Sequence, residues 1–120
     1  MLSDAARAQI LSHRERYPEG RQKSAVMGAL HIAQAELGWL SPEVFREVGE
    51  LLGLAPVHVA AVATFYTMYE KEPVGENIID VCCNISCMLR GAYEILEHIE
   101  QRLGIKRGET TADGKVTIRE

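Results

Sequence analysis

The residues Ile78–Gly91, IIDVCCNISCMLRG, contain all three cysteines of this 120-residue chain: Cys82, Cys83 and Cys87. A short apolar run precedes them and has the length and composition of a β-strand. A long helical pattern follows them, so we expect the cysteines on a strand-to-helix turn. The first N–H groups of a helix have no intrahelical partner and favour negative charge. Such a turn would stabilise thiolates, or the sulfur atoms of a cluster that they hold.

The composition, 47% hydrophobic and 25% charged, is that of a soluble globular protein. The net charge of −4 does not indicate nucleic-acid binding. No apolar run approaches the roughly 20 residues needed to cross a bilayer, and the N-terminus lacks the apolar stretch of a signal peptide. We therefore expect a cytoplasmic protein that is not inserted in a membrane. In that compartment, crowded cysteines indicate metal ligation, redox chemistry or small buried residues rather than a disulfide framework.

The first half of the chain has the periodicity of a helical bundle. We expect four helices, over Ser3–Tyr17, over Ser24–Leu37, from the start signal Ser41-Pro42-Glu43 to Leu52, and over Val57–Ala63 after Pro56. In the aromatic segment that follows, Phe65 and Tyr69 are one helical turn apart and are expected in the core. If exposed, this segment would indicate a partner surface. The charged, turn-forming residues 70–76 separate a helical domain, 1–76, from a second domain, 77–120.

The second domain is predicted to be strand, helix, strand. We expect the strands near Asn77–Val81 and Lys115–Ile118 and the helix over Met88–Leu103. The helical positions expected to face inward are Leu89, Ala92, Tyr93, Leu96, Ile99 and Leu103. Two strands leave exposed edges and little sheet to share, so this domain looks incomplete. The predicted fold class is α+β, a helical bundle followed by an incomplete α/β domain.

The spacing Cys82-x4-Cys87 allows two thiolates to reach one iron, because the loop between them folds back around the metal. A [2Fe–2S] cluster needs four thiolates, and the chain has three cysteines. Cys83 would point to the opposite face if strand geometry persisted. Spacing alone leaves a ligand role and small buried residues without metal both open. A redox dithiol is less favoured, because its usual Cys-x-x-Cys spacing is absent.

Other kinds of site have little support in the sequence. Zinc requires four ligands in tetrahedral geometry, and the histidines show no paired spacing that suggests a metal site. The histidines are His13, His31, His58 and His98. The chain has no glycine-rich phosphate loop and no Ser/His/Asp arrangement, so we predict neither a catalytic residue nor a nucleotide site.

Several segments, in chain order, resemble one family. They read GWLS at 38–41, VATFYTM at 62–68, PVG at 73–75, VC at 81–82 with CMLRG at 87–91, LGIK at 103–106 and GETTADG at 108–114. Together they resemble the 24 kDa (E) subunit of bacterial and mitochondrial respiratory NADH:quinone oxidoreductase, complex I. Related subunits occur in NAD-linked hydrogenases and formate dehydrogenases. The resemblance covers nearly the whole chain.

The resemblance implies a helical bundle followed by a thioredoxin-like ferredoxin domain with a [2Fe–2S] cluster on four cysteines. The first cysteine pair of the family has x4 spacing, which matches Cys82 and Cys87, whereas Cys83 is not at a ligand position. The resemblance also implies docking beside the FMN-bearing subunit, where FMN takes hydride from NADH. The chain would then be an electron-transfer subunit of an enzyme, without an NADH or FMN site of its own. Its complex would hold it on the cytoplasmic side of the membrane.

The sequence departs from the family at its C-terminal end. The family's second pair, Cys-x3-Cys, would lie beyond Glu120, so Cys82 and Cys87 cannot complete a cluster within one such chain. We therefore expect a truncated thioredoxin-like domain in a fragment of a longer product, whose isolated monomer binds little or no cluster. The alternative is a cluster-free scaffold or assembly module. Two chains could physically supply two thiolates each, if the open sheet edges docked.

Overall fold

The computed structural model describes residues 1–120 and divides them into two compact units, Met1–Pro73 and Val74–Glu120. The division falls inside the charged segment 70–76 that separates the two predicted domains. The chain contains both helices and a small parallel sheet, and the predicted α+β class is confirmed.

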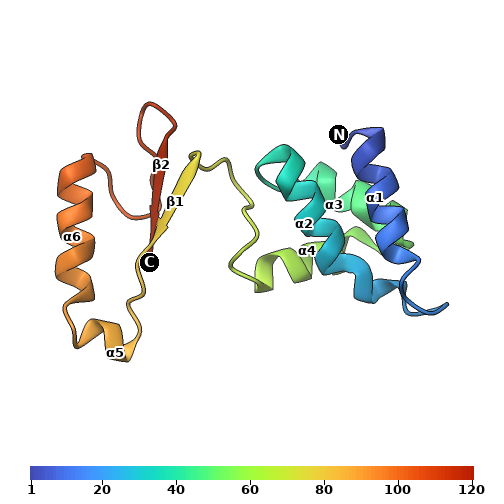
Figure 1. Ribbon diagram of the computed structural model, residues 1–120, viewed down its shortest axis with the longest axis horizontal. Coiled ribbons are helices and arrows are strands. Elements are labelled where there is room, and N and C mark those ends of the chain that lie inside the picture. The colour runs from blue at the N-terminus through green and yellow to red at the C-terminus, as the bar shows by residue number, and fades with distance from the viewer. The chain divides into compact units, whose positions relative to one another are not determined.

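The first unit is a bundle of helices (Figure 1). Its elements are α1 (Asp4–Arg14), the 3-10 turn η1 (Gln22–Ala25), α2 (Val26–Leu37), α3 (Pro42–Leu52) and α4 (Pro56–Phe65). Ser3 begins α1, because its Oγ accepts a hydrogen bond from the backbone N–H of Ala6 at 3.2 Å. Gly53 ends α3 with a φ of 69°, in the left-handed region that favours glycine. The first two helices are shorter than predicted, since α1 stops before Tyr17 and a 3-10 turn replaces the start of the second.

One apolar core joins the helices of the first unit. α1 packs on α2, and α3 packs on α4. The largest side chains that are fully buried in this core are Ile10, Leu30, Leu40, Val48, Val59 and Tyr69. The bundle is therefore held by burial of apolar surface, which is the main favourable term in folding.

The segment after α4 is held to α2 by two hydrogen bonds, one to the nitrogen and one to the oxygen of the Gln34 side-chain amide. Gln34 Nε2 donates to the carbonyl of Met68 at 2.9 Å, and Gln34 Oε1 accepts from the N–H of Glu70 at 2.7 Å. Between them, the Tyr69 hydroxyl donates to the carbonyl of Met27 at 3.0 Å. These bonds fix Tyr69 in the core, as the sequence predicted.

Phe65 was predicted in the core, and that prediction is wrong: 77% of its surface is exposed. The helix ends at this residue, and Tyr66 has extended backbone with φ −94° and ψ 122°. The helical spacing that would place Phe65 and Tyr69 on one face therefore does not continue across this stretch.

The second unit is built on β1 (Asn77–Asp80) and β2 (Val116–Arg119), which pair in parallel (Figure 1). In their register, Asn77 lies opposite Val116 and Asp80 opposite Arg119. The connection between them contains two helices, α5 (Ile85–Met88) and α6 (Ala92–Leu103). The predicted strand, helix, strand order is confirmed.

The two edges of this sheet differ. The segment 108–111 runs along β2, where the Gly108 N–H donates to the Ile118 carbonyl at 2.7 Å and the Thr111 N–H donates to the Val116 carbonyl at 2.8 Å. β2 is therefore paired on both sides. The sheet contains only β1 and β2, so the outer edge of β1 has no strand partner within this chain.

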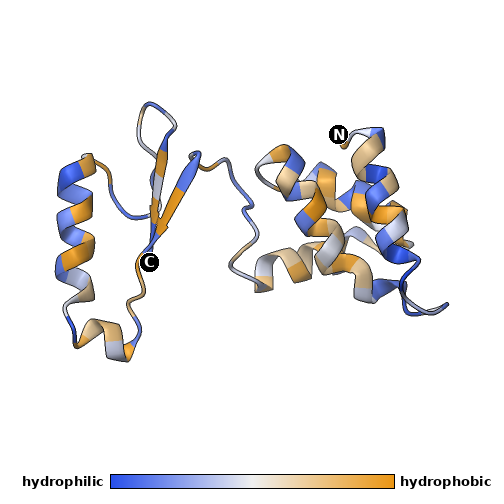
Figure 2. Ribbon diagram, viewed as in Figure 1, coloured by the Kyte–Doolittle hydropathy of each residue, from blue (hydrophilic) through white to orange (hydrophobic).

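The single helix predicted over Met88–Leu103 is wrong, because Gly91 interrupts it. The short α5 ends at Met88, and Gly91, with a φ of 89°, is the N-cap from which α6 begins. Ala92 and Leu96 are buried as predicted, whereas Leu89 is 77% exposed and Tyr93 is also exposed. Figure 2 shows hydrophilic and hydrophobic residues alternating along α6, as expected of a helix that packs on one side.

No single helix is long and apolar enough to cross a membrane. The helices α3 and α4 reach that length and apolarity only when taken together, and they are bent by 118° at the break between them.

We expect Tyr69→Phe to lower the free energy of unfolding of the first unit by about 1 kcal/mol, because the buried carbonyl of Met27 loses its donor. The only tryptophan, Trp39, lies in this unit, so its fluorescence during urea unfolding reports on the unit directly. The matched control is Tyr66→Phe, at an exposed tyrosine, with an expected change within about 0.5 kcal/mol. Equal losses in the two variants would contradict the role of the hydrogen bond.

We expect the pairing of β1 with β2 to weaken in acid through Asp80. Arg119 donates to both carboxylate oxygens of Asp80, at 2.7 and 2.9 Å, and this holds the pKa of Asp80 below its ordinary value. Because the pKa is lower in the folded state, the ionised carboxylate stabilises the fold at pH values above the unfolded pKa of about 3.9. This stabilisation is lost as the pH falls through the folded-state pKa. The exposed pair contributes less than about 1 kcal/mol.

The Asp80→Asn variant should lack this pH-dependent part of the stability. The control variant Glu97→Gln, on α6, should keep it. The measurement is hydrogen-exchange protection of the strand amides between pH 7 and pH 3, corrected for the intrinsic exchange rate at each pH. The same acid response in Asp80→Asn and in the unmodified chain would contradict the assignment.

Candidate functional site

The cysteines lie in residues 81–89, which we call the cysteine turn. The turn leaves the end of β1, and its first residue is held to β2 because the N–H of Val81 donates to the carbonyl of Arg119 at 2.9 Å. Cys82 and Cys83 lie between β1 and α5, and Cys87 lies within α5. The predicted strand-to-helix position is confirmed, with the difference that the helix after the turn is short.

The structure brings Cys82 and Cys87 together. Cys82 is exposed and Cys87 is half-buried. Hydrogen bonds from the backbone N–H of Asn84 and from the Cys87 thiol lower the pKa of Cys82. The same thiol–thiol hydrogen bond, with the nearby negative charge of an ionised Cys82, raises the pKa of Cys87. The two thiols therefore lie close enough to interact, and a metal cation can replace the protons of thiols placed in this way.

Cys83 does not join this pair. Its half-buried Sγ makes a weak hydrogen bond to the carbonyl of Val81, with a separation of 3.6 Å. β1 ends at Asp80, so strand alternation no longer sets the direction of this side chain. No three His, Cys, Asp or Glu side chains of the chain come close enough to hold a metal ion.

The donor set fits one iron of a [2Fe–2S] cluster. Two thiolates bind each iron of such a cluster, and Cys82 and Cys87 are two adjacent thiols at an accessible turn. Four thiolates are needed for both irons, and this chain contains three cysteines. Cys82 and Cys87 would hold one iron of such a cluster and leave the other iron without its pair.

A second surface stands out on α4. The stretch from Leu51 through Tyr69 contains no Asp, Glu, Lys or Arg. Val57 is 67% exposed and Phe65 is 77% exposed, and the Phe65 ring meets the ring of Tyr66 edge-on with centroids 5.0 Å apart. We call four exposed side chains the α4 apolar face: Val57 and Phe65 on α4, and Tyr66 and Met68 directly after it. The absence of charge in 51–69 is a sequence signal for this surface. Phe65 was expected in the core, and its exposure is the condition under which the sequence indicated a partner surface.

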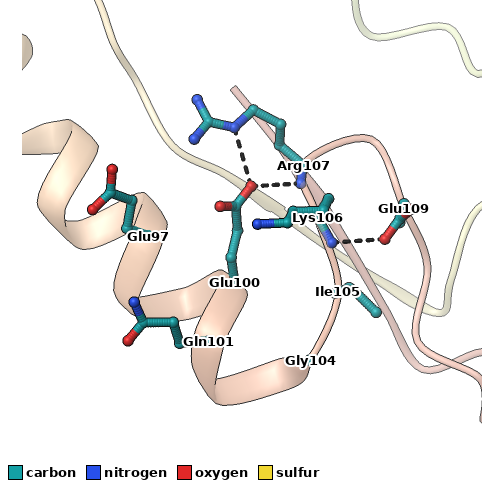
Figure 3. A pocket seen from close by; sticks show the side chains of 8 residues that line it. All are labelled: Glu97, Glu100, Gln101, Gly104, Ile105, Lys106, Arg107 and Glu109. Atoms are coloured by element: carbon teal, nitrogen blue, oxygen red, sulfur yellow. Dashed lines mark hydrogen bonds and ion pairs between the residues drawn. The ribbon is translucent and has the colours of Figure 1, made fainter.

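A pocket of about 520 Å³ lies at the C-terminal end of α6, away from the cysteines (Figure 3). Two of its glutamates accept hydrogen bonds from neighbouring residues of the pocket. Glu100 Oε1 accepts from the N–H of Arg107 at 2.8 Å and from its Nε at 3.1 Å, and the N–H of Lys106 donates to Glu109 at 2.7 Å. Arg107 also reaches Glu120 at 2.9 Å. This network joins α6 to the residue after β2, and we assign the pocket no ligand.

The chain is similar to subunits of NADH-quinone oxidoreductases and of a mitochondrial NADH dehydrogenase. It is 46% identical over 112 residues to the NADH-quinone oxidoreductase E 2 subunit of Rhizobium meliloti (strain 1021), covering 93% of this chain and 66% of that protein. It is 41% identical over 101 residues to NADH-quinone oxidoreductase subunit 2 of Thermus thermophilus, covering 84% of this chain and 55% of the relative. It is also 41% identical over 104 residues to the mitochondrial NADH dehydrogenase [ubiquinone] flavoprotein 2 of Dictyostelium discoideum, covering 86% of this chain and 42% of that protein.

The chain thus spans between 42% and 66% of the length of these relatives. The predicted resemblance to the 24 kDa (E) subunit of NADH:quinone oxidoreductase is confirmed by these similarities. The family model of the thioredoxin-like [2Fe–2S] ferredoxins matches residues 10–120, which is nearly the whole chain. On this evidence, the chain belongs to the thioredoxin-like [2Fe–2S] ferredoxin family.

Proposed function

We propose that this chain is the electron-transfer iron–sulfur subunit of the NADH dehydrogenase module of an NADH:quinone oxidoreductase, with Cys82 and Cys87 as ligands of one iron. The observation that carries the proposal is the adjacency of these two thiols on an accessible turn, while Cys83 bonds elsewhere. Membership of a [2Fe–2S] family and the names of the relatives support the same assignment.

When bound, a [2Fe–2S] cluster supplies a site that gains and loses single electrons. The protein's own residues position the cysteine turn and leave it accessible. Pairing of Val81 and Asp80 with Arg119 fixes the start of the cysteine turn, and the exposure of Cys82 leaves one side open to an electron donor. In this proposal, hydride transfer from NADH belongs to a flavin-bearing partner, which would carry the NADH and FMN sites.

The ligand assignment is tested by loading the chain in excess glutathione, a small thiol that can complete the coordination of iron. With ferric iron and sulfide added without oxygen, we expect Cys82→Ser and Cys87→Ser each to lose at least 90% of the bound iron and sulfide. Cys83→Ser is the matched control and should retain both. Metal and sulfide analysis with visible absorption measures the result, and equal retention in all three variants would contradict the assignment.

We further propose that the α4 apolar face docks on the FMN-bearing subunit, and that the complex holds the chain at the cytoplasmic side of the membrane. α4 is apolar around its circumference, and such a helix is normally buried, yet Val57 and Phe65 are exposed in this chain. An exposed aromatic pair in a stretch without charged residues, here 51–69, is typical of the centre of a protein interface.

We expect Phe65→Glu to weaken binding to the FMN-bearing subunit by about 30-fold or more, because a charge would be buried against an apolar partner. Arg46→Glu, at an exposed position on α3, is the control and should change the Kd less than about threefold. Titration calorimetry with the purified partner measures both. A cluster-free scaffold would show this docking together with no loading in the glutathione experiment. That scaffold is the second candidate function, favoured by the absence of a third ligand near the two thiols.

A further inference from the structure

Two side chains of the α4 apolar face, Tyr66 and Met68, lie on a segment without helix or strand. α4 ends at Phe65, and the next strand begins at Asn77. Side chains on an irregular segment can take many conformations, and a complex that fixes them must offset the lost conformational entropy. The docking surface is therefore only as well defined as the backbone that carries Tyr66 and Met68.

Gln34 of α2 holds this backbone at two points. Its Nε2 donates to the carbonyl of Met68 at 2.9 Å, and its Oε1 accepts from the N–H of Glu70 at 2.7 Å. A primary amide carries its donor and its acceptor side by side, so one side chain serves a carbonyl and the N–H two residues later. The Gln34 amide thus fastens the segment to α2 at Met68, whose side chain is exposed.

The other bonds that reach the segment from the rest of the bundle act on its buried residues. The Tyr69 hydroxyl donates to the carbonyl of Met27 at 3.0 Å, and the N–H of Leu40 donates to the carbonyl of Glu70 at 2.7 Å. Tyr69 is fully buried, and Glu70 is buried as well. Of the bonds that come from α2 and from Leu40, only that of Gln34 Nε2 therefore contacts a residue of the α4 apolar face.

We infer that Gln34 is a positioning residue of the α4 apolar face, and that its amide holds residues 66–70 in the conformation that docks on the FMN-bearing subunit. This inference rests on the docking proposed above. The end of α4 fixes one side of the exposed stretch, where the ring centroids of Phe65 and Tyr66 lie 5.0 Å apart. Gln34 fixes the other side at Met68. A surface that is already held in its bound conformation loses less entropy on binding, so its affinity is higher.

The first test is Gln34→Glu in the full chain, with binding to the purified FMN-bearing subunit measured by titration calorimetry. The carboxylate still accepts from the N–H of Glu70, but it has no donor for the Met68 carbonyl and places a negative charge beside it. We expect the Kd to rise about tenfold or more at pH 7.5. Gln9→Glu, at an exposed position on α1, adds the same charge and should change the Kd less than about threefold.

Acid should restore the binding of the Gln34→Glu variant. A protonated carboxyl has an O–H donor, so it can donate to the Met68 carbonyl and still accept from the N–H of Glu70. The ratio of its Kd to that of the unmodified chain should fall at least about threefold between pH 7.5 and pH 4, as the introduced carboxyl takes up its proton. The titratable side chains nearby are Glu70 and His31, whose ring lies 5.1 Å from that of Tyr69. Both are present in the unmodified chain, so the ratio removes their effect. A loss of bundle stability alone would not recover in acid, and a ratio that does not change with pH would overturn the inference.

A double-mutant cycle tests whether Gln34 acts through the exposed side chains that it positions. In a chain that carries both Tyr66→Ala and Met68→Ala, the docking surface has lost the two side chains on the segment. Gln34→Glu should then change the Kd less than about threefold at pH 7.5, because little remains to be positioned. The same tenfold loss in both backgrounds would show that Gln34 acts elsewhere, and the positioning role would fall.

The Phe65→Glu variant separates this inference from the docking proposal. If Phe65→Glu weakens binding and Gln34→Glu binds like the unmodified chain at pH 7.5, the positioning role is wrong and the docking surface stands. If Phe65→Glu leaves the Kd unchanged, the docking proposal is wrong and the role of Gln34 falls with it.

Discussion

The parallel pairing of β1 with β2 is the constraint on which the cysteine site depends. Parallel strands cannot be joined by a tight turn, and the chain must leave the end of the first strand and cross back to the start of the second. That departure is where Cys82 and Cys87 lie. Because Val81 bonds to the last paired residue of β2, the register of two short strands sets where the thiols begin. The site is thus positioned by backbone pairing more than by side-chain packing.

Much of the fold could be predicted from local sequence signals. Ser3 and Pro42 stand at the starts of α1 and α3 as expected, and α3 ends at Leu52 as predicted, where Gly53 takes left-handed backbone. The prediction of one helix over Met88–Leu103 failed at Gly91. The apolar period continues across it from Leu89 to Leu96, and a glycine inside a helical pattern does not by itself show whether it breaks the helix. Its positive φ depends on the turn that precedes it, which periodicity does not describe.

The candidate site was predictable only in part. The x4 spacing correctly indicated that Cys82 and Cys87 can meet across a turn. The direction of Cys83 was argued from strand alternation, but the strand stops at Asp80 and a hydrogen bond to Val81 holds that thiol instead. Phe65 was assigned to the core because spacing alone cannot show where α4 ends, although an exposed aromatic segment had been weighed as the alternative. A helix end moves Phe65 to the surface while Tyr69, a few residues later, stays in the core.

The lack of charge between Leu51 and Tyr69 has a thermodynamic consequence for any surface that covers α4. Salt screens charge–charge attraction, so a complex formed on this stretch should keep most of its affinity as ionic strength rises. It would also gain little from electrostatic steering, and its association rate should stay near that of neutral proteins. Burial of apolar surface makes the heat-capacity change of binding negative. The affinity of this contact should therefore change far more with temperature than with salt concentration.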